Sequence, residues 1–193
     1  EKGSRGSAHT WQDREAAASL AAQLKKEGTL KTPRIIDAFL AVQRGDFLPA
    51  DMKDAALLNS ALPIGWDQTI SQPSVVAFML EQLAPQKGER VLDIGAGSGW
   101  TTTLLASIVG IKGKVAAIEV IPELAEFGKK NIEKYAFLHK GVVTYLSKDG
   151  VTGYLKEAPY DRILVSASLQ NKILPPAWKD QLKIGGRIVA PVK

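Results

Sequence analysis

Three glycines at alternate positions are the first residues whose type and spacing indicate a chemical role. Gly95, Gly97 and Gly99 follow the apolar run 91–94 and precede residues 101–109, whose pattern predicts a helix. Glycine lets the backbone turn tightly and approach a ligand, because it has no Cβ. A dinucleotide-binding loop reads G-x-G-x-x-G, whereas this loop reads G-x-G-x-G. The spacing therefore favours a nucleoside without phosphates, and a turn that binds nothing is the alternative.

Three carboxylates at the ends of predicted strands extend the same chemistry. Asp93 belongs to the first strand, Glu119 closes the second and Asp149 comes just after the third. Glu119 can accept both hydroxyls of a ribose, and Asp149 can accept the exocyclic amine of an adenine, with Gly150 letting the base lie close. Asp93 could hold the loop or meet an ammonium group of the ligand. These residues predict an adenosine-containing ligand, with three solvated loop carboxylates as the alternative.

The run Gln68-Thr69-Ile70-Ser71 is the second candidate site, and it precedes a predicted helix at 73–83. Residues 49–63 before it are predicted to be a loop, with a short turn of helix around 55–58 as an alternative. Because Pro73 lies in the first turn of the helix, Ser71 falls at or beside the N-cap. A serine hydroxyl there can accept a hydrogen bond from a free backbone N–H, worth about 1 kcal/mol. The residues alone leave open whether Ser71 caps the helix or takes part in a reaction.

The elements that must position these residues alternate between strands and helices. Strands are predicted at 91–94, 114–119, 142–147, 162–166 and 187–191, with helices at 101–109, 122–135 and 175–182. Right-handed crossovers between such strands produce a doubly wound α/β fold, in which a mostly parallel sheet carries helices on both faces. Ligands bind beyond the carboxyl ends of the strands, where the strand order reverses. The three carboxylates are therefore expected at one rim of the sheet.

The first 60 residues predict a helical extension in front of this core. Residues 1–9 are mostly small and polar, which indicates a disordered tail or a remnant of cloning. One helix is predicted from Thr10 to about Glu27, and a second opens at Thr32. We therefore divide the chain into the tail 1–9 and a single domain 10–193, which comprises a helical extension 10–60 and a cofactor-binding core 61–193.

The composition limits the class of protein. The 193 residues suffice for one well-buried domain. The net charge of +5 permits an acidic partner, yet the basic residues are spread along the chain without a polybasic block. No apolar run approaches the roughly 20 residues of a membrane helix, and the first residues lack the apolar core of a signal peptide. With no cysteine and two histidines, a metal site is not expected. We expect a soluble, cytoplasmic protein without a membrane partner, whose oligomeric state is open.

The motifs together resemble a known family. Residues 91–100, 117–119 and 148–150 resemble class I S-adenosylmethionine-dependent methyltransferases. Residues 62–73 are similar to the P-I-G-x-x-Q-T-I-S-x-P signature of the protein-L-isoaspartate (D-aspartate) O-methyltransferase family, and the resemblance extends from about Leu20 to the last residue. It implies a Rossmann-like fold and methyl transfer from S-adenosyl-L-methionine, leaving S-adenosyl-L-homocysteine. The implied acceptor is the free carboxylate of L-isoaspartyl residues in damaged peptides and proteins, a repair reaction.

The resemblance also implies roles for individual residues. A carboxylate is ionised at pH 7 and can attack a sulfonium methyl group directly, so the site must mainly align the reacting atoms and exclude water. Ser71 and Thr69 would be the catalytic residues, contacting the carboxylate or shaping the transfer site. The residues expected to surround the cofactor are Gln68, Ile70, Asp93, Gly95, Gly97, Glu119, Val120, Asp149 and Gly150.

Several departures from the family pattern concern the substrate side. Leu57 and Asn59 stand where the family commonly has Tyr and Asp, and Ser74 stands where it often has His or Tyr. The family also continues beyond the strand at 187–191 with further strands, which we expect to be missing here. These differences could alter peptide recognition without touching the cofactor.

Two rival functions stay open. The first is an adaptor that binds isoaspartyl sites with little or no turnover, and the second is an RNA-directed methyltransferase. An N6-adenine methyltransferase would need Asn or Asp before a Pro-Pro pair and an aromatic residue after it, but here Leu174 precedes the pair and Ala177 follows it. That motif is absent, and nucleic acid is not the expected partner.

Overall fold

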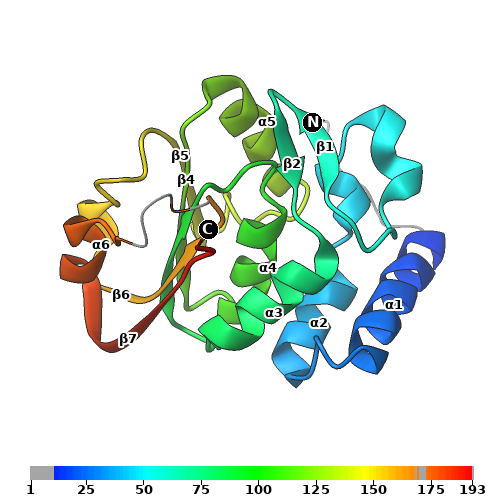
Figure 1. Cartoon of the computed structure of the whole chain (residues 1–193), viewed down its shortest axis with the longest axis horizontal. Coiled ribbons are helices and arrows are strands. Elements are labelled where there is room, and N and C mark those ends of the chain that lie inside the picture. The colour runs from blue at the N-terminus through cyan, green and yellow to red at the C-terminus, as the bar shows by residue number, and fades with distance from the viewer. Residues whose placement is uncertain (1–10, 168, 170–172, 193) are drawn as a thin grey trace, which may run out of the picture.

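A five-stranded parallel sheet forms the centre of the molecule in the computed structural model, which describes residues 11–167, 169 and 173–192 (Figure 1). The predicted tail and Thr10 lie outside the described residues. The sheet order is β5-β4-β3-β6-β7. The strands are β3 (Arg90–Ile94), β4 (Lys114–Glu119), β5 (Val143–Ser147), β6 (Tyr160–Val165) and β7 (Leu182–Val189). The predicted doubly wound α/β fold is confirmed.

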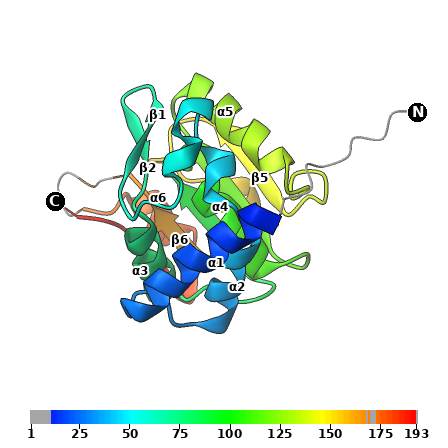
Figure 2. The ribbon, with the colours of Figure 1, turned by 90° about the vertical axis from the view of Figure 1, so that its right-hand side faces the viewer.

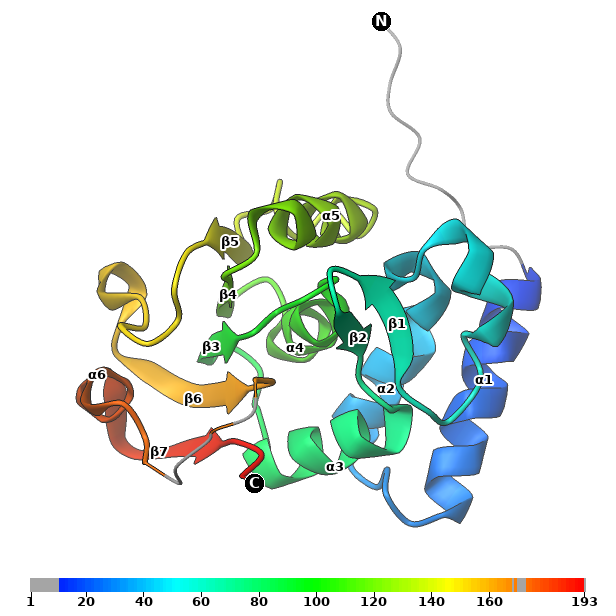
Figure 3. The same ribbon diagram turned by 45° about the horizontal axis from the view of Figure 1, so that its top comes forward.

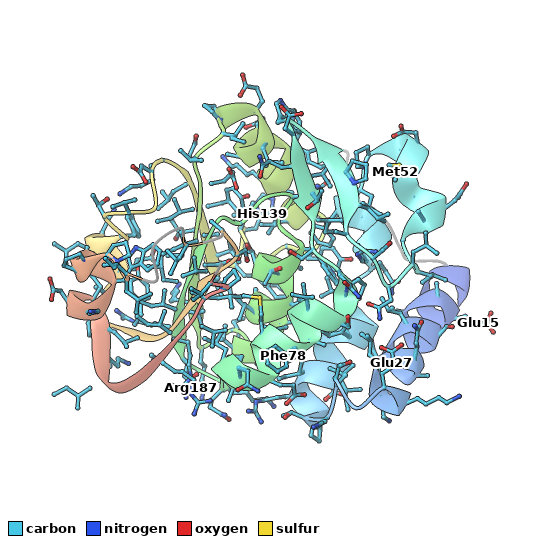
Figure 4. The ribbon with its side chains drawn as sticks, viewed as in Figure 1. Glu15, Glu27, Met52, Phe78, His139 and Arg187 are labelled. Carbon is cyan, nitrogen blue, oxygen red and sulfur yellow. The ribbon has the colours of Figure 1, made fainter. Side chains whose placement is uncertain are left out.

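Helices cover both faces of the sheet (Figure 3). One face carries α3 (Pro73–Leu83), α4 (Trp100–Val109) and α5 (Pro122–Glu133), and the other carries η3 (Leu155–Glu157) and α6 (Pro176–Asp180). Side chains of a strand alternate between faces, so Val91 packs with the core on the α4 side and Leu92 with the core on the α6 side. Side chains fill both layers (Figure 4). Burial on both faces explains why these strands are continuous apolar runs in the sequence.

The N-terminal elements pack beyond α4, on the side away from the sheet (Figure 2). They are α1 (Trp11–Lys26), α2 (Pro33–Ala41), η1 (Arg44–Phe47) and η2 (Ala50–Ala55). Phe39 of α2 meets Trp100 of α4 edge to face, with ring centroids 5.7 Å apart. Thr32 lies at the N-cap of α2 as predicted, but its hydroxyl donates to Glu81 Oε2 (2.6 Å) of α3 and makes no capping bond. Thr32 therefore ties two helices together.

The stretch before α3 corrects our prediction. The predicted loop at 49–63 contains η2 and the beginning of β1 (Leu62–Gly65), which pairs antiparallel with β2 (Gln68–Ile70). At the tip of this hairpin, Trp66 and Asp67 have φ values of 53° and 55°. Type I′ hairpin turns have positive φ at both central residues and usually contain Asn-Gly or Asp-Gly. The Trp-Asp pair does not carry that sequence signal, which is why the hairpin was not predicted.

The last strand also differs from the prediction, because β7 begins at Leu182 instead of 187. Leu182 pairs with Tyr160 and Arg187 with Arg162, so three extra residues of β7 bulge out between these pairs. Gly185 lies within the bulge with a φ of 79°. The bulge interrupts the apolar run that marks a buried strand, and for this reason the sequence pattern shows only the second half of β7.

Candidate functional site

Two cavities adjoin each other beyond the carboxyl ends of β3 and β4. A cavity of about 210 Å³, which we call the polar cavity, lies between residues 95–99, which we call the glycine loop, and the β1–β2 hairpin. A cavity of about 320 Å³, which we call the apolar cavity, lies between the ends of β3 and β4 and the α6 side. Gly95, Val120 and Ala167 line both. One elongated ligand can therefore occupy the two cavities together, at the place where the strand order reverses.

The glycine loop turns its backbone toward the polar cavity. Gly95 and Gly97 have φ values of 80° and 56°, a region that favours glycine. A Cβ on Gly95 would lie 3.1 Å from the backbone N of Ala167, whereas a Cβ on Gly97 would meet only Ile64, at 3.8 Å. Gly97 therefore leaves its side of the loop open for a ligand.

Two side chains hold the peptide groups of Gly97 in place. Its N–H donates to Glu119 Oε2 (2.9 Å), and its carbonyl accepts from the hydroxyl of Tyr145 (2.7 Å). Tyr145 lies on β5 and packs close to Gly128 of α5, where a Cβ would be 2.5 Å from both the Tyr145 hydroxyl and the Gly97 oxygen. We did not predict Tyr145 or Gly128 as site residues. A glycine inside an otherwise good helix was the available signal, because it needs a packing reason.

Replacing Gly128 with Ala should destabilise the protein by about 2 kcal/mol, within the range of overpacked cores. The direction of this change is informative, because an Ala in place of an interior Gly normally stabilises a helix by roughly 0.5–1 kcal/mol. Urea unfolding measures the effect, and Glu126→Ala on the exposed side of α5 is the control, expected within about 0.5 kcal/mol of wild type. A Gly128→Ala variant as stable as wild type would show that the contact between α5 and the glycine loop is loose.

Glu119 closes β4 and is 5% exposed. Its Oε1 accepts from the N–H of Ile121 (3.0 Å), in addition to the bond between Oε2 and Gly97. Each carboxylate oxygen has a second acceptor position, so both remain able to accept a ligand hydroxyl. The side chain lines the polar cavity. Glu119 thus holds the loop from below and presents acceptors to the cavity.

The predicted adenine-side residues lie at the apolar cavity. Asp149 is exposed at its rim and accepts a hydrogen bond from the N–H of Val151 (2.9 Å). Gly150 is buried, and its carbonyl accepts from the indole N–H of Trp178 (2.8 Å). A Cβ on Gly150 would lie 2.6 Å from Cγ2 of Ile94, so packing against Ile94 requires this glycine. Gly150 thus lets the chain pack against Ile94 at the cavity wall, and because it also lines the apolar cavity, its contact with the base stays a prediction.

Asp93 lies behind the loop and is not among the described residues that line either cavity. It is fully buried, and its Oδ2 accepts from the hydroxyl of Thr102 (2.6 Å), whereas Oδ1 has no hydrogen-bond partner among the described residues. Burial raises the pKa of Asp93 to about 7, with a smaller contribution from the charge of Glu119 and an opposing one from the Thr102 bond. The geometry favours the first of its two predicted roles, which was to hold the loop.

The residues of the second candidate site, Gln68 to Ser71, line the polar cavity opposite the glycine loop. The N-cap of α3 is Gln72, and its side chain makes no capping hydrogen bond. The hydroxyl of Ser71 makes no hydrogen bond within the described part of the chain, while Asn59 Oδ1 accepts from the N–H of Ser74 (3.0 Å) in the first turn. The capping interpretation of Ser71 is therefore wrong. Its hydroxyl is available to a ligand.

The described part of the chain contains neither a metal-binding cluster of side chains nor a helix long and apolar enough to span a membrane. No group of three His, Cys, Asp or Glu side chains lies close enough together there to hold a metal ion. Within the same residues, every helix is too short or too polar to cross a bilayer.

The chain is also similar to known proteins of one family. The model of the family described as protein-L-isoaspartate (D-aspartate) O-methyltransferase matches residues 15–193. A protein-L-isoaspartate O-methyltransferase of Methanopyrus kandleri is 44% identical over 93% of this chain and 77% of its own length. One of Aeropyrum pernix is 43% identical over 93% of this chain and 67% of its own length.

Solved structures agree with these relatives. A structure named protein-L-isoaspartate O-methyltransferase superposes with a TM-score of 0.82 at 32% identity, over 91% of this chain and 55% of that one. A Plasmodium falciparum protein, described under the same enzyme name and solved with S-adenosyl-L-homocysteine, gives a TM-score of 0.81 at 25% identity and covers 91% and 83%. The chain therefore belongs to the protein-L-isoaspartate (D-aspartate) O-methyltransferase family.

Proposed function

We propose that this protein transfers a methyl group from S-adenosyl-L-methionine to the free carboxylate of L-isoaspartyl residues in peptides and damaged proteins. The observation that carries the proposal is the polar cavity, which has the glycine loop with Glu119 on one side and the turn from Thr69 to Ser71 on the other. One wall suits the sugar of a nucleoside, and the other offers an unengaged hydroxyl to an acceptor.

The residues around the two cavities fit this cofactor. Ile94 and Ile118 give the apolar cavity the surface that a planar base requires, and Asp149 at its rim can accept the amine of adenine. Val120 is 61% exposed although it is apolar, and it stands where the two cavities join. Glu119 would accept the ribose hydroxyls. When bound, the cofactor supplies an electrophilic methyl group on a sulfonium centre.

The protein then has to position the acceptor and exclude water. An isoaspartyl carboxylate is ionised near pH 7 and needs no general base. Ser71 would donate its hydroxyl hydrogen to one carboxylate oxygen, and Thr69 would shape the cavity on the same side. Ile70 is buried between them and closes the wall with an apolar side chain. Alignment of the reacting atoms supplies most of the rate, as in other reactions in which two bound reactants meet.

A labelled methyl group distinguishes this proposal from its rivals. Wild-type protein with labelled cofactor is offered an isoaspartyl peptide and the same peptide with a normal aspartyl residue. We expect label on the isoaspartyl peptide alone. Cofactor binding without transfer would favour the adaptor, and transfer to both peptides would remove the repair function. Salt-dependent binding of RNA with methyl transfer to it would favour the RNA-directed enzyme.

Replacing Ser71 with Ala should lower kcat for the isoaspartyl peptide about tenfold, the value of one lost hydrogen bond to a charged group. Because Ser71 caps nothing, the thermal midpoint should stay within about 1 °C of wild type, and the Kd for S-adenosylhomocysteine should stay within about twofold. Steady-state kinetics and calorimetry measure these quantities. Ser107→Ala, near the far end of α4, is the control for an unrelated serine. A loss of stability with unchanged kcat would refute the role of the hydroxyl.

A further inference from the structure

Arg44 lies behind the turn that contains Ser71 and is 4% exposed. Its guanidinium group donates to backbone carbonyls of two segments that are distant in sequence. The accepting oxygens are those of Ala56 (3.0 Å), Leu58 (3.0 Å), Ser60 (2.8 Å) and Ser71 (3.2 Å). One side chain thus joins the loop at 56–60 to the end of the β1–β2 hairpin.

The carbonyl of Ser71 depends on this contact. Ser71 follows the end of β2 and precedes the N-cap of α3, so neither the strand ladder nor the helix holds its carbonyl. The same loop carries Asn59, whose side chain accepts from the N–H of Ser74 in the first turn of α3. Arg44 therefore fixes the segment of Ser71 directly, and also through the loop that caps the following helix.

Arg44 also touches the wall of the polar cavity. Its guanidinium carbon lies 5.3 Å from the ring centroid of Trp100, the first residue of α4, which lines that cavity. Burial lowers the pKa of Arg44 to about 10, so the group remains charged at neutral pH. In the described part of the chain, the guanidinium group contacts the four backbone carbonyls and the face of the Trp100 ring, and these dipoles and the ring balance its charge. A buried charge is costly, which makes a purely space-filling role a poor explanation.

We infer that Arg44 is a positioning residue for methyl transfer, which holds the Ser71 turn in register with the cofactor cavity through the Ser71 carbonyl. This inference rests on the proposed function. An error of about 1 Å in the alignment of reacting atoms can cost roughly 100-fold in rate. The guanidinium plane is needed because its fork reaches several carbonyls at once, whereas the ammonium of a lysine is a point charge.

The test compares Arg44→Lys and Arg44→Ala with wild type. We expect kcat for the isoaspartyl peptide to fall at least tenfold in both variants, while the Kd for S-adenosylhomocysteine, measured by calorimetry, stays within about threefold. Arg34→Ala is the control, because Arg34 donates to the Pro85 carbonyl and neither residue lines the cavities. It should keep the wild-type kcat.

Chemical rescue separates positioning from a general loss of structure. A cavity of about 430 Å³ borders Arg44 and is also lined by Lys53 and Leu57, which are exposed, so a small cation can reach the vacated space from solvent. Millimolar guanidinium, well below denaturing concentrations, should raise the kcat of Arg44→Ala about fivefold or more. Sodium chloride at equal ionic strength should not, and guanidinium should not activate wild type or Arg34→Ala.

The outcomes are distinct. If wild type methylates the peptide and the Arg44 variants keep its kcat, the inference is overturned and the proposed function stands. If cofactor affinity and thermal stability are lost together and guanidinium rescues neither kcat nor affinity, Arg44 is only structural. If Arg44→Ala does not fold, the kcat of Arg44→Lys decides alone. If wild type transfers no methyl group to the isoaspartyl peptide, the proposed function fails and the inference fails with it.

Discussion

Replacing Glu119 with Ala should weaken the binding of S-adenosylhomocysteine several hundredfold, measured by calorimetry. Two hydrogen bonds from ribose hydroxyls to a carboxylate, each worth about 1.5–3 kcal/mol, would be lost. The variant also removes the acceptor for the N–H of Gly97, so the glycine loop is no longer held in its ligand-binding form. The two losses act on the same cavity and should reinforce each other.

The stability of the protein without ligand separates the two contributions. The N–H groups of Gly97 and Ile121 lose their acceptor in the Ala variant, yet water can reach the cavity that Gly97 faces. The unfolding free energy should therefore fall by only about 1–2 kcal/mol. Glu123→Ala, in the exposed first turn of α5, is the control and should bind within about twofold of wild type. Unchanged affinity in Glu119→Ala would refute the ribose contact.

The sheet was predictable from the sequence because its signals are local. Each strand of a parallel sheet is buried on both faces, so runs such as 91–94 and 114–119 are continuous and apolar. Chain crossovers have one hand, and strand ends carry the ligand site. These rules bring Gly97 and Glu119 to one cavity before any coordinates are known.

The supporting residues were not predictable in the same way, because their partners are distant in the chain. Tyr145 contacts Gly97 across 48 residues, and Arg44 contacts Ser71 across 27. Neither spacing has a sequence signature. In one case a signal existed: Val91 and Asp93 alternate with Leu92, so both face the α4 side of the sheet. That parity places the Asp93 carboxylate near Thr102 instead of in the cavity.

The burial of Asp93 should appear as a pH dependence of stability. We expect the free energy of unfolding of wild type to fall by about 3 kcal/mol more between pH 5 and pH 8 than that of Asp93→Asn. The folded-state pKa is about 7, raised from 3.8, so between these values the folded protein keeps a proton on Asp93 that the unfolded chain has lost. Each pH unit in that window costs about 1.4 kcal/mol, and the window from pH 5 to pH 7 spans about two units. The stabilisation is complete below the unfolded pKa and is lost as pH rises through 7.

Urea unfolding at several pH values measures the free energy of unfolding of both proteins. Comparing how steeply this free energy changes with pH removes any constant cost of placing the amide of the Asp93→Asn variant beside Thr102. Thr102→Val is the matched control: it removes the hydrogen bond that lowers the Asp93 pKa, so its loss of stability should extend to higher pH than in wild type. Parallel curves for wild type and Asp93→Asn would mean that Asp93 is ionised throughout this range.

A bound cation in the adjoining cavity favours the ionised form of Asp93. Wild type should therefore release protons when the sulfonium cation S-adenosylmethionine binds near pH 7, and Asp93→Asn should release fewer. Calorimetry in two buffers of different ionisation enthalpy counts these protons, and so tests whether the buried carboxylate responds to a ligand in cavities that it does not line.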